Sequence, residues 1–193
     1  LKKNYFRIIC PALARSHNKS HILKNLIKKV KFEDVTEKYS CIGLFGPNSR
    51  KFLTELSGNY FSNENFPFSR GMYINISNIK VWFQRLSFVG ELGWEIYIPI
   101  QKTNIIFKKI KKLGKKYKLT YSGMHTLDIL RLEKKFLHWG HDITSENNPF
   151  ESGLGFAVNF KKKENFIGRE ELEKLRNKPL KKKLELFSLK NRF

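Results

Sequence analysis

The segment R-L-S-F-V-G-E-L-G-W-E, residues 85–95, decides the fold because it joins two strand-like stretches through a short turn. Gly90 and Gly93 bracket the turn, and glycine permits the tight backbone that such a turn needs. Residues 81–88 before the turn and 95–100 after it alternate apolar with polar side chains, as half-buried strands do. The segment therefore predicts two strands connected by a glycine-flanked turn.

Strands and helices are predicted on both sides of this turn. Alternating apolar residues, or runs of β-branched and aromatic residues, predict strands at 4–10, 35–39, 41–45 and 72–76. Apolar residues at helical spacing predict helices at about 18–30, between Gly46-Pro47 and Gly58, at 103–117, from 122 onward and at 169–176. Hairpin-like strand pairs between amphipathic helices favour an α+β fold, with antiparallel sheets and flanking helices.

The composition is strongly basic. The 193 residues include 38 Lys and Arg against 17 Asp and Glu, which gives a formal net charge of +21. Nine of the basic residues are Arg, which leaves 29 Lys, and Asn, Ile and Phe are also abundant. Because the codons of all four residues are AT-rich, we attribute the charge to coding bias on solvated faces. Nucleic-acid binding would instead interleave Lys and Arg with aromatic residues on one face.

The sequence lacks the motifs of several other classes of site. It contains neither G-x-G-x-x-G nor G-x-x-x-x-G-K, so it predicts no dinucleotide-binding domain. No apolar stretch approaches the ~18 residues of a membrane span. Cys10 and Cys41 lie in apolar runs, which predicts buried, unbonded thiols. His138 and His141 have no carboxylate or cysteine at ligand spacing, so we expect no metal site.

Glu95 is the first candidate for chemistry. A carboxylate beside aromatic residues suits a flat heterocycle, because it can accept two N–H bonds while Phe88 or Trp94 packs against the ring. The alternative is a hairpin in which Glu95 is solvated and the aromatic side chains belong to the core. Residues 128–142 and 148–158 are two further segments of unusual composition, and the second predicts a loop that enters a strand.

These segments form a series of motifs in a fixed order. They are D-V-T-E (34–37), G-P-N-S-R (46–50), G-E-L-G-W-E (90–95), L-R-L-E-K (130–134), W-G-H-D-I (139–143), N-P-F-E-S-G-L-G-F (148–156) and F-I-G-R-E (166–170). The series resembles the glycine-cleavage T-protein family (GcvT), whose members have the folate-binding aminomethyltransferase fold. The forms G-E-L-G-W-E and H-W-G-H-D-I most resemble the C-terminal half of dimethylglycine and sarcosine dehydrogenases.

The resemblance implies a tetrahydrofolate site on the first segment. Glu95 would hold the amino and ring N–H groups of the pterin, and Phe88 would pack against the folate where relatives often carry a Tyr. The full set of cofactor-binding residues implied is Arg85, Phe88, Leu92, Gly93, Trp94 and Glu95. The family's catalytic Asp is expected upstream of Leu1, so no catalytic residue is assigned in the chain.

The resemblance also implies a division into parts. Residues 1–180 would form a partial folate-binding domain, and 181–193 would begin a truncated C-terminal β-barrel domain. An FAD-binding domain would precede the chain, and the chain by itself would lack the activity of the whole. The location implied is the cytoplasm, or the mitochondrial matrix in a eukaryote.

The function implied is one-carbon transfer coupled to oxidation. An FAD-dependent dimethylglycine or sarcosine dehydrogenase-like enzyme would oxidise a small N-methyl amine, and tetrahydrofolate would capture the carbon as 5,10-methylene-tetrahydrofolate. The partners expected are this amine and folate, whose polyglutamate tail a lysine-rich rim would attract, with neither nucleic acid nor a membrane. The alternatives are an aminomethyltransferase (T-protein) of the glycine cleavage system and a non-catalytic folate-binding or regulatory relative.

Overall fold

Four antiparallel strands form one sheet in the computed structural model, which describes residues 4–189. The strands are β1 (Tyr39–Phe45), β2 (Gly71–Ile76), β3 (Ile79–Gln84) and β4 (Gly93–Pro99), in the spatial order β1-β4-β3-β2. Ser77 and Asn78 both have positive φ, 46° and 65°, which is the backbone of a tight hairpin turn between β2 and β3. With the helices described next, this sheet confirms the predicted α+β fold.

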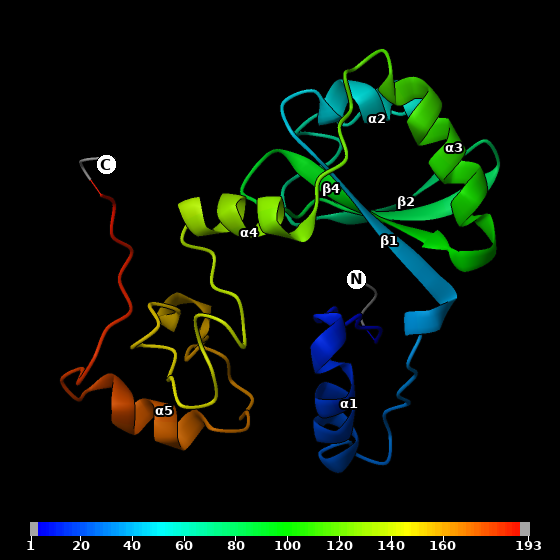
Figure 1. The fold of residues 1–193 in the computed structure, drawn as a ribbon. Coiled ribbons are helices and arrows are strands. Elements are labelled where there is room, and N and C mark those ends of the chain that lie inside the picture. Colours follow the sequence, from blue (N-terminus) through cyan, green and yellow to red (C-terminus); the bar gives the residue numbers. More distant parts are fainter. Residues whose placement is uncertain (1–3, 190–193) are drawn as a thin grey trace.

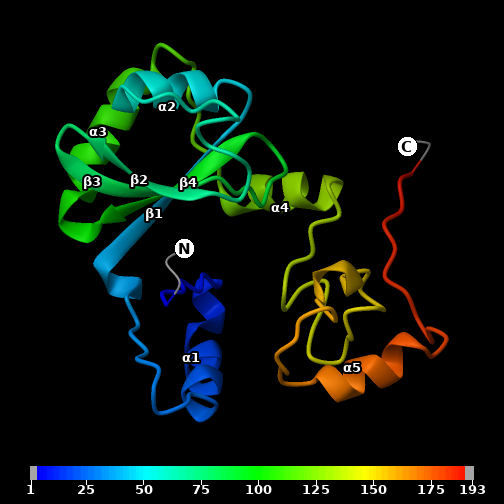
Figure 2. The ribbon, with the colours of Figure 1, turned by 180° about the vertical axis from the view of Figure 1, so that it is seen from behind.

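Five α-helices accompany the sheet in the described part of the chain. They are α1 (Arg15–Lys24), α2 (Ser49–Ser57), α3 (Thr103–Gly114), α4 (Met124–Glu133) and α5 (Arg169–Arg176). Short 3-10 helices occur at Ala12–Ala14, Thr36–Lys38, Ile100–Lys102 and Gly155–Ala157. Figure 1 shows α2 and α3 together over one face of the sheet, while α1 lies on the other side. The view from behind shows the same arrangement (Figure 2).

The core fills the space between the sheet and the helices α2 and α3. It is apolar and rich in aromatic side chains, and its buried members are Leu44, Phe52, Leu53, Phe61, Phe66, Ile74, Ile76, Val81, Phe83, Trp94, Ile96, Ile98, Ile106 and Ile110. Each fully buried side chain of this size stabilises the fold by roughly 1.5–3 kcal/mol relative to an exposed one. Trp94, Ile96 and Ile98 alternate along β4, so the side chains between them lie on the opposite, open face of the sheet.

The prediction of a strand at residues 4–10 is wrong. This segment pairs with none of the four strands. Arg7 instead lies against the open face, with its guanidinium 4.7 Å from the centroid of the Trp82 ring and donating a hydrogen bond to the Tyr73 hydroxyl at 3.2 Å. The segment therefore packs across the open face instead of extending the sheet at an edge.

The predicted helix at 18–30 is shifted towards the N-terminus. The helix α1 ends at Lys24, where the Asn25 backbone N–H bonds to the Ile22 carbonyl oxygen and the Asn25 side chain donates to the His21 carbonyl oxygen at 2.8 Å. These bonds close the last turn and compete with a further helical residue.

The predicted strand at 35–39 is replaced by a 3-10 turn. The carboxylate of Asp34 accepts hydrogen bonds from the Thr36 backbone N–H at 3.1 Å and from the Thr36 hydroxyl at 2.7 Å. Such local bonds from an Asp side chain favour a turn over a strand. Both cysteines, expected to be buried, are free and exposed.

The part of the chain after α4 has no strand among its described residues. The loop at 148–158 leads to a 3-10 helix rather than to the predicted strand. The helix α5 begins and ends where it was predicted. A domain boundary at residue 180 stays a prediction, and the outermost parts of the two predicted domains, residues 1–3 and 190–193, lie outside the described residues.

Gly93 provides a test of how closely β1 and β4 approach. A Cβ on Gly93 would lie under 3.0 Å from the Leu44 carbonyl oxygen and from the Phe45 side chain. Since the backbone oxygen cannot move aside without loss of the strand pairing, we expect Gly93→Ala to lower the free energy of unfolding by about 1–3 kcal/mol. Urea unfolding followed by tryptophan fluorescence measures this loss.

Gly123 is the matched control. It has a negative φ and no heavy atom within 4 Å of an added Cβ, so Gly123→Ala should cost less than about 1 kcal/mol. Equal losses for the two substitutions would contradict a tight contact at Gly93.

Candidate functional site

Glu95 lies in the middle of the open face of the sheet. It is half-buried on β4, and its direct neighbours across the sheet are Gly43 on β1 and Gln84 on β3. Gly43 carries no side chain, and the Gln84 amide nitrogen donates to the Ser69 carbonyl oxygen at 2.8 Å. Neither neighbour occupies the Glu95 carboxylate with a hydrogen bond or an ion pair.

Tyr97 lies beside Glu95 on the same face. Its direct neighbours across the sheet are Cys41 and Trp82. The Tyr97 hydroxyl donates a hydrogen bond to Glu95 Oε2 at 2.5 Å. Burial, together with this hydrogen bond, raises the pKa of Tyr97 well above its ordinary value. Although Cys41 is exposed by its surface area, partial desolvation of the thiol by the side chains around it and the Glu95 charge raise the pKa of that thiol to about 11, so both groups are protonated at neutral pH.

An aromatic ring does lie near Glu95, but it belongs to Phe45 rather than to the turn. Ring atoms of Phe45 lie where a Cβ on Gly43 or on Gly93 would be. Gly43 is the direct neighbour of Glu95, so the ring adjoins the carboxylate. With Tyr97, this gives the carboxylate two aromatic neighbours on the open face, while Trp82 is the direct neighbour of Tyr97 and packs against Tyr73 and Arg7.

Trp94 is a core residue. Its side chain is fully buried, with ring centroids 5.3 Å from Phe61 and 5.9 Å from Phe66. The guanidinium of Arg85 lies 5.7 Å from the Trp94 ring and donates to the Phe66 carbonyl oxygen at 2.7 Å. In this structure Trp94 therefore offers no face to a ligand, and Arg85 fixes the loop that precedes β2.

The remaining predicted residues connect the turn to its surroundings. The Leu92 carbonyl oxygen accepts hydrogen bonds from the Gly46 backbone N–H at 2.8 Å and from the Ser49 hydroxyl at 3.0 Å. Through these bonds the motif G-P-N-S-R, which contains Gly46 and Ser49, holds the motif G-E-L-G-W-E, which contains Leu92. Phe88 stacks on Phe136 at a centroid distance of 6.5 Å and so joins the turn to the chain after α4.

Arg131 holds the next motif together. It is buried on α4 and forms ion pairs with Asp128 and Asp142. Asp142 also accepts a hydrogen bond from the His138 backbone N–H at 2.7 Å. Burial by itself raises the pKa of Asp142, but the bonds from His138 and Arg131 outweigh it and lower that pKa. The residues L-R-L-E-K and W-G-H-D-I thus close a loop around the Arg131 guanidinium.

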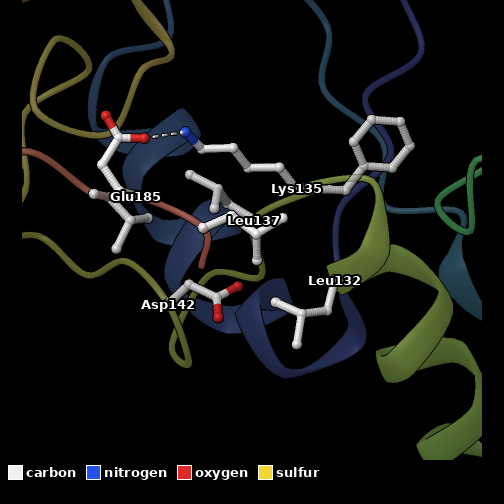
Figure 3. A pocket seen from close by; sticks show the side chains of 8 residues that line it. Leu132, Lys135, Leu137, Asp142 and Glu185 are labelled. Atoms are coloured by element: carbon white, nitrogen blue, oxygen red, sulfur yellow. Dashed lines mark hydrogen bonds and ion pairs between the residues drawn. The ribbon is translucent and has the colours of Figure 1, made fainter. Parts of the chain in front are cut away.

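A small cavity lies where the chain after α4 meets the C-terminal segment (Figure 3). It is lined by Leu132, Lys135, Phe136, Leu137, Asp142, Leu184, Glu185 and Leu186. Lys135 and Glu185 form an ion pair of 3.1 Å at its edge. Its volume of about 120 Å³ is below the roughly 300 Å³ of a small-molecule pocket. The candidate site is the open face around Glu95, where the structure brings the carboxylate together with Tyr97 and the ring of Phe45.

Two classes of site are not found in the described residues. Residues 4–189 contain no group of three or more His, Cys, Asp or Glu side chains that could hold a metal ion. Over the same residues, no helix combines the length and the apolar character that crossing a membrane requires.

Four side chains of the open face were missed in the sequence. The two-residue alternation that places Glu95 on this face also applies to Tyr97, Trp82 and Gln84. These three residues could therefore have been predicted from the sequence. Phe45 could not be found in this way, because its place beside Glu95 depends on the register between β1 and β4.

Comparison with known proteins decides the family. The sequence profile described as the GCVT N-terminal domain of the GCV_T family matches residues 1–162, which is most of the chain. The chain belongs to the GCV_T family. This confirms the resemblance drawn from the motifs.

Three proteins with established names align with 80–97% of this chain. Sarcosine dehydrogenase, mitochondrial, of Homo sapiens is 35% identical over 97% of this chain and 21% of that protein. Dimethylglycine dehydrogenase, mitochondrial, of Mus musculus is 33% identical over 80% of this chain and 18% of that protein. Aminomethyltransferase of Caldanaerobacter subterraneus is 31% identical over 96% of this chain and 50% of that protein. The chain thus spans about a fifth of the dehydrogenases and half of the transferase.

The Arg131 ion pairs predict a pH-dependent stability. Asp142→Asn leaves Arg131 without its inner partner, and we expect a loss of about 3 kcal/mol at pH 7. Because the pKa of Asp142 is lowered by folding, its contribution is present above the unfolded pKa of about 4 and disappears as the pH falls through the lower folded value. The difference between wild type and Asp142→Asn in urea unfolding should therefore shrink from pH 5 to pH 3.

Asp128→Asn is the matched control for this experiment. Asp128 also pairs with Arg131, but its side chain is 49% exposed, so its loss should cost at most about 1 kcal/mol. A difference between wild type and Asp142→Asn that stays constant down to pH 3 would contradict the role given to Asp142.

Proposed function

We propose that this member of the GCV_T family binds tetrahydrofolate on the open face of its sheet, with Glu95 as the acceptor for the pterin. The observation that carries the proposal is a half-buried carboxylate beside aromatic side chains, whose hydrogen-bond partner is the Tyr97 hydroxyl. Among residues 4–189, no Lys, Arg or His forms an ion pair with Glu95. Such a carboxylate is free to accept N–H donors from a ligand.

The residues of the open face supply the chemistry that a pterin requires. The carboxylate of Glu95 would accept N–H donors of the ring, and the ring of Phe45 offers apolar surface beside it. Tetrahydrofolate, when bound, supplies nucleophilic amines that capture a one-carbon unit. The chain's own part is to bind and orient it, which raises the effective concentration of the reacting groups.

The whole activity we propose is that of a dimethylglycine or sarcosine dehydrogenase-like enzyme. Two observations support this proposal: the similarity of the chain to the two dehydrogenases, and the residues of the motif G-E-L-G-W-E. The small N-methyl amine, the FAD and the catalytic Asp would belong to other parts of such an enzyme, and in a eukaryote its place would be the mitochondrial matrix. A G-x-G-x-x-G fingerprint encoded some hundreds of residues upstream would distinguish it from a T-protein.

Aminomethyl transfer in the manner of a T-protein is the second candidate. It is favoured by the similarity to aminomethyltransferase, of which the chain covers half. The two candidates share the folate site and differ in the donor of the one-carbon unit, so the test of Glu95 applies to both.

Glu95→Gln tests the folate site in the full-length protein. The substitution keeps the size of the side chain but removes the charge and one pair of acceptors. Since a hydrogen bond to a charged group is worth about 1.5–3 kcal/mol, we expect the dissociation constant for tetrahydrofolate to rise roughly 10- to 100-fold. Isothermal titration calorimetry under anaerobic conditions measures it.

Glu91 provides the control, because it lies in the same turn and is exposed. Glu91→Gln makes the same change of charge and should leave the affinity within twofold of the wild type. Unchanged affinity in Glu95→Gln would refute the assignment of the pterin to Glu95.

The positive net charge predicts that the polyglutamate tail of a folate adds modestly to its affinity for the protein. The helix α3, which carries exposed lysines, lies over one face of the sheet (Figure 1), and the alternation along β4 places Glu95 on the other face. The attraction of these lysines for a polyglutamate tail would therefore be long-range and screened by salt. Polyglutamyl tetrahydrofolate should bind more tightly than the monoglutamyl form at about 10 mM salt, and the preference should vanish near 1 M. Equal affinities at low salt would contradict this prediction.

A further inference from the structure

The hydrogen bond between Tyr97 and Glu95 is the least expected feature of the open face. The Tyr97 hydroxyl donates to Glu95 Oε2 at 2.5 Å. The phenol lies between Cys41 and Trp82, its direct neighbours on the adjacent strands, so its position is restricted on both sides. A half-buried phenol in a fixed position that donates to a carboxylate can determine where that carboxylate points.

We propose that Tyr97 is the positioning residue for Glu95: by binding Oε2 it fixes the carboxylate and presents Oε1 to the N–H donors of the ligand. The proposal rests on the proposed function of Glu95 and adds to it the residue that orients the acceptor. Tyr97 acts through Glu95 and does not need to touch the ligand.

No other described side chain does this for Glu95. Gly43, on one side, has no side chain, and Gln84, on the other, donates its amide hydrogen to the Ser69 carbonyl oxygen. Without Tyr97 the carboxylate of Glu95 would rotate freely about its terminal bonds. Ligand binding would then have to restrict the rotation of the carboxylate. The loss of conformational entropy would oppose binding and weaken the affinity.

The surroundings keep Tyr97 a donor. Burial and the Glu95 charge raise its pKa, and a phenol that stays protonated through the physiological range always has a hydrogen to donate. The adjacent Cys41 thiol is neutral as well, because its pKa is about 11. No Lys or Arg of the described chain forms an ion pair with Glu95, so Tyr97 meets no competitor for the carboxylate.

Binding of tetrahydrofolate by a set of four full-length proteins tests the proposal: wild type, Tyr97→Phe, Glu95→Gln and the double variant. Tyr97→Phe keeps the ring and removes the donor, and we expect a dissociation constant about tenfold higher than that of the wild type. In the Glu95→Gln background the same change should have an effect of less than twofold, because the carboxylate to be positioned is gone. Such non-additivity is the mark of a residue that acts through another.

Tyr117→Phe is the matched control. Tyr117 also donates to a carboxylate, Glu55 Oε2, at 2.7 Å, but it lies among the helices on the covered side of the sheet. Its substitution should leave the affinity unchanged. Thermal unfolding of each variant identifies any that has lost its fold.

The outcomes separate the proposal from the function on which it rests. If the wild type fails to bind tetrahydrofolate, or if Glu95→Gln binds as tightly as the wild type, the proposed function falls and the role of Tyr97 falls with it. If Glu95→Gln weakens binding but Tyr97→Phe does not, only the positioning role is overturned. Equal losses from Tyr97→Phe in both backgrounds would show a purely structural effect and would overturn it too.

Discussion

The close approach of β1 and β4 at Gly93 is the constraint on which the rest of the structure depends. Gly93 pairs with Phe45 where an added Cβ would meet the Leu44 carbonyl oxygen. This contact sets the phase of the alternation along β4. A slip of one residue would move Trp94 to the open face and Glu95 into the apolar core, so the same contact that builds the core also places the candidate site.

The effect of this constraint extends to the start of α2. The Leu92 carbonyl oxygen, just before Gly93, accepts hydrogen bonds from Gly46 and Ser49, so the turn, the end of β1 and the first turn of the helix are fixed together. Because the carbonyl group and both donors are buried or half-buried, their hydrogen bonds have to be made within the protein. Residues that look like ligand contacts in the sequence, Leu92 and Gly93, therefore have a structural role in this network.

Local patterns predicted the elements that local chemistry determines. The helix α5, the C-terminal Gly58 of α2 and the alternation of β4 were all readable, because caps and burial periodicity lie within a few residues. The segments at 4–10 and 18–30 were not predicted correctly, since their apolar residues resemble those of buried elements yet stay exposed, with Ile8 at 67% and Ile27 at 66%. Whether an apolar run finds a partner is a property of the whole fold.

In the candidate site, too, some features follow from local sequence and others depend on the whole fold. That Glu95 and Trp94 point to opposite faces follows from strand geometry alone, but which of them faces the core depends on α2 and α3. The ring of Phe45 and the neighbours of Tyr97 come from other strands, so only the register could place them. Arg131 likewise resembles an ordinary surface residue of a helix until its partner Asp142, beyond the end of that helix, folds back onto it.

The net charge of +21 and the single charge of Glu95 act over different distances. Exposed lysines such as those of α3 contribute a field that salt screens within about 10 Å at 0.1 M. The carboxylate of Glu95 is half-buried, adjoins aromatic rings and is bonded by one phenol, so its interaction with a ligand is short-range and weakly screened. Recognition of a flat heterocycle requires acceptors placed to within a fraction of an ångström, and a diffuse positive field cannot provide that. The feature that dominates the composition is therefore secondary to one oriented carboxylate, whose position is set by a glycine contact between two strands.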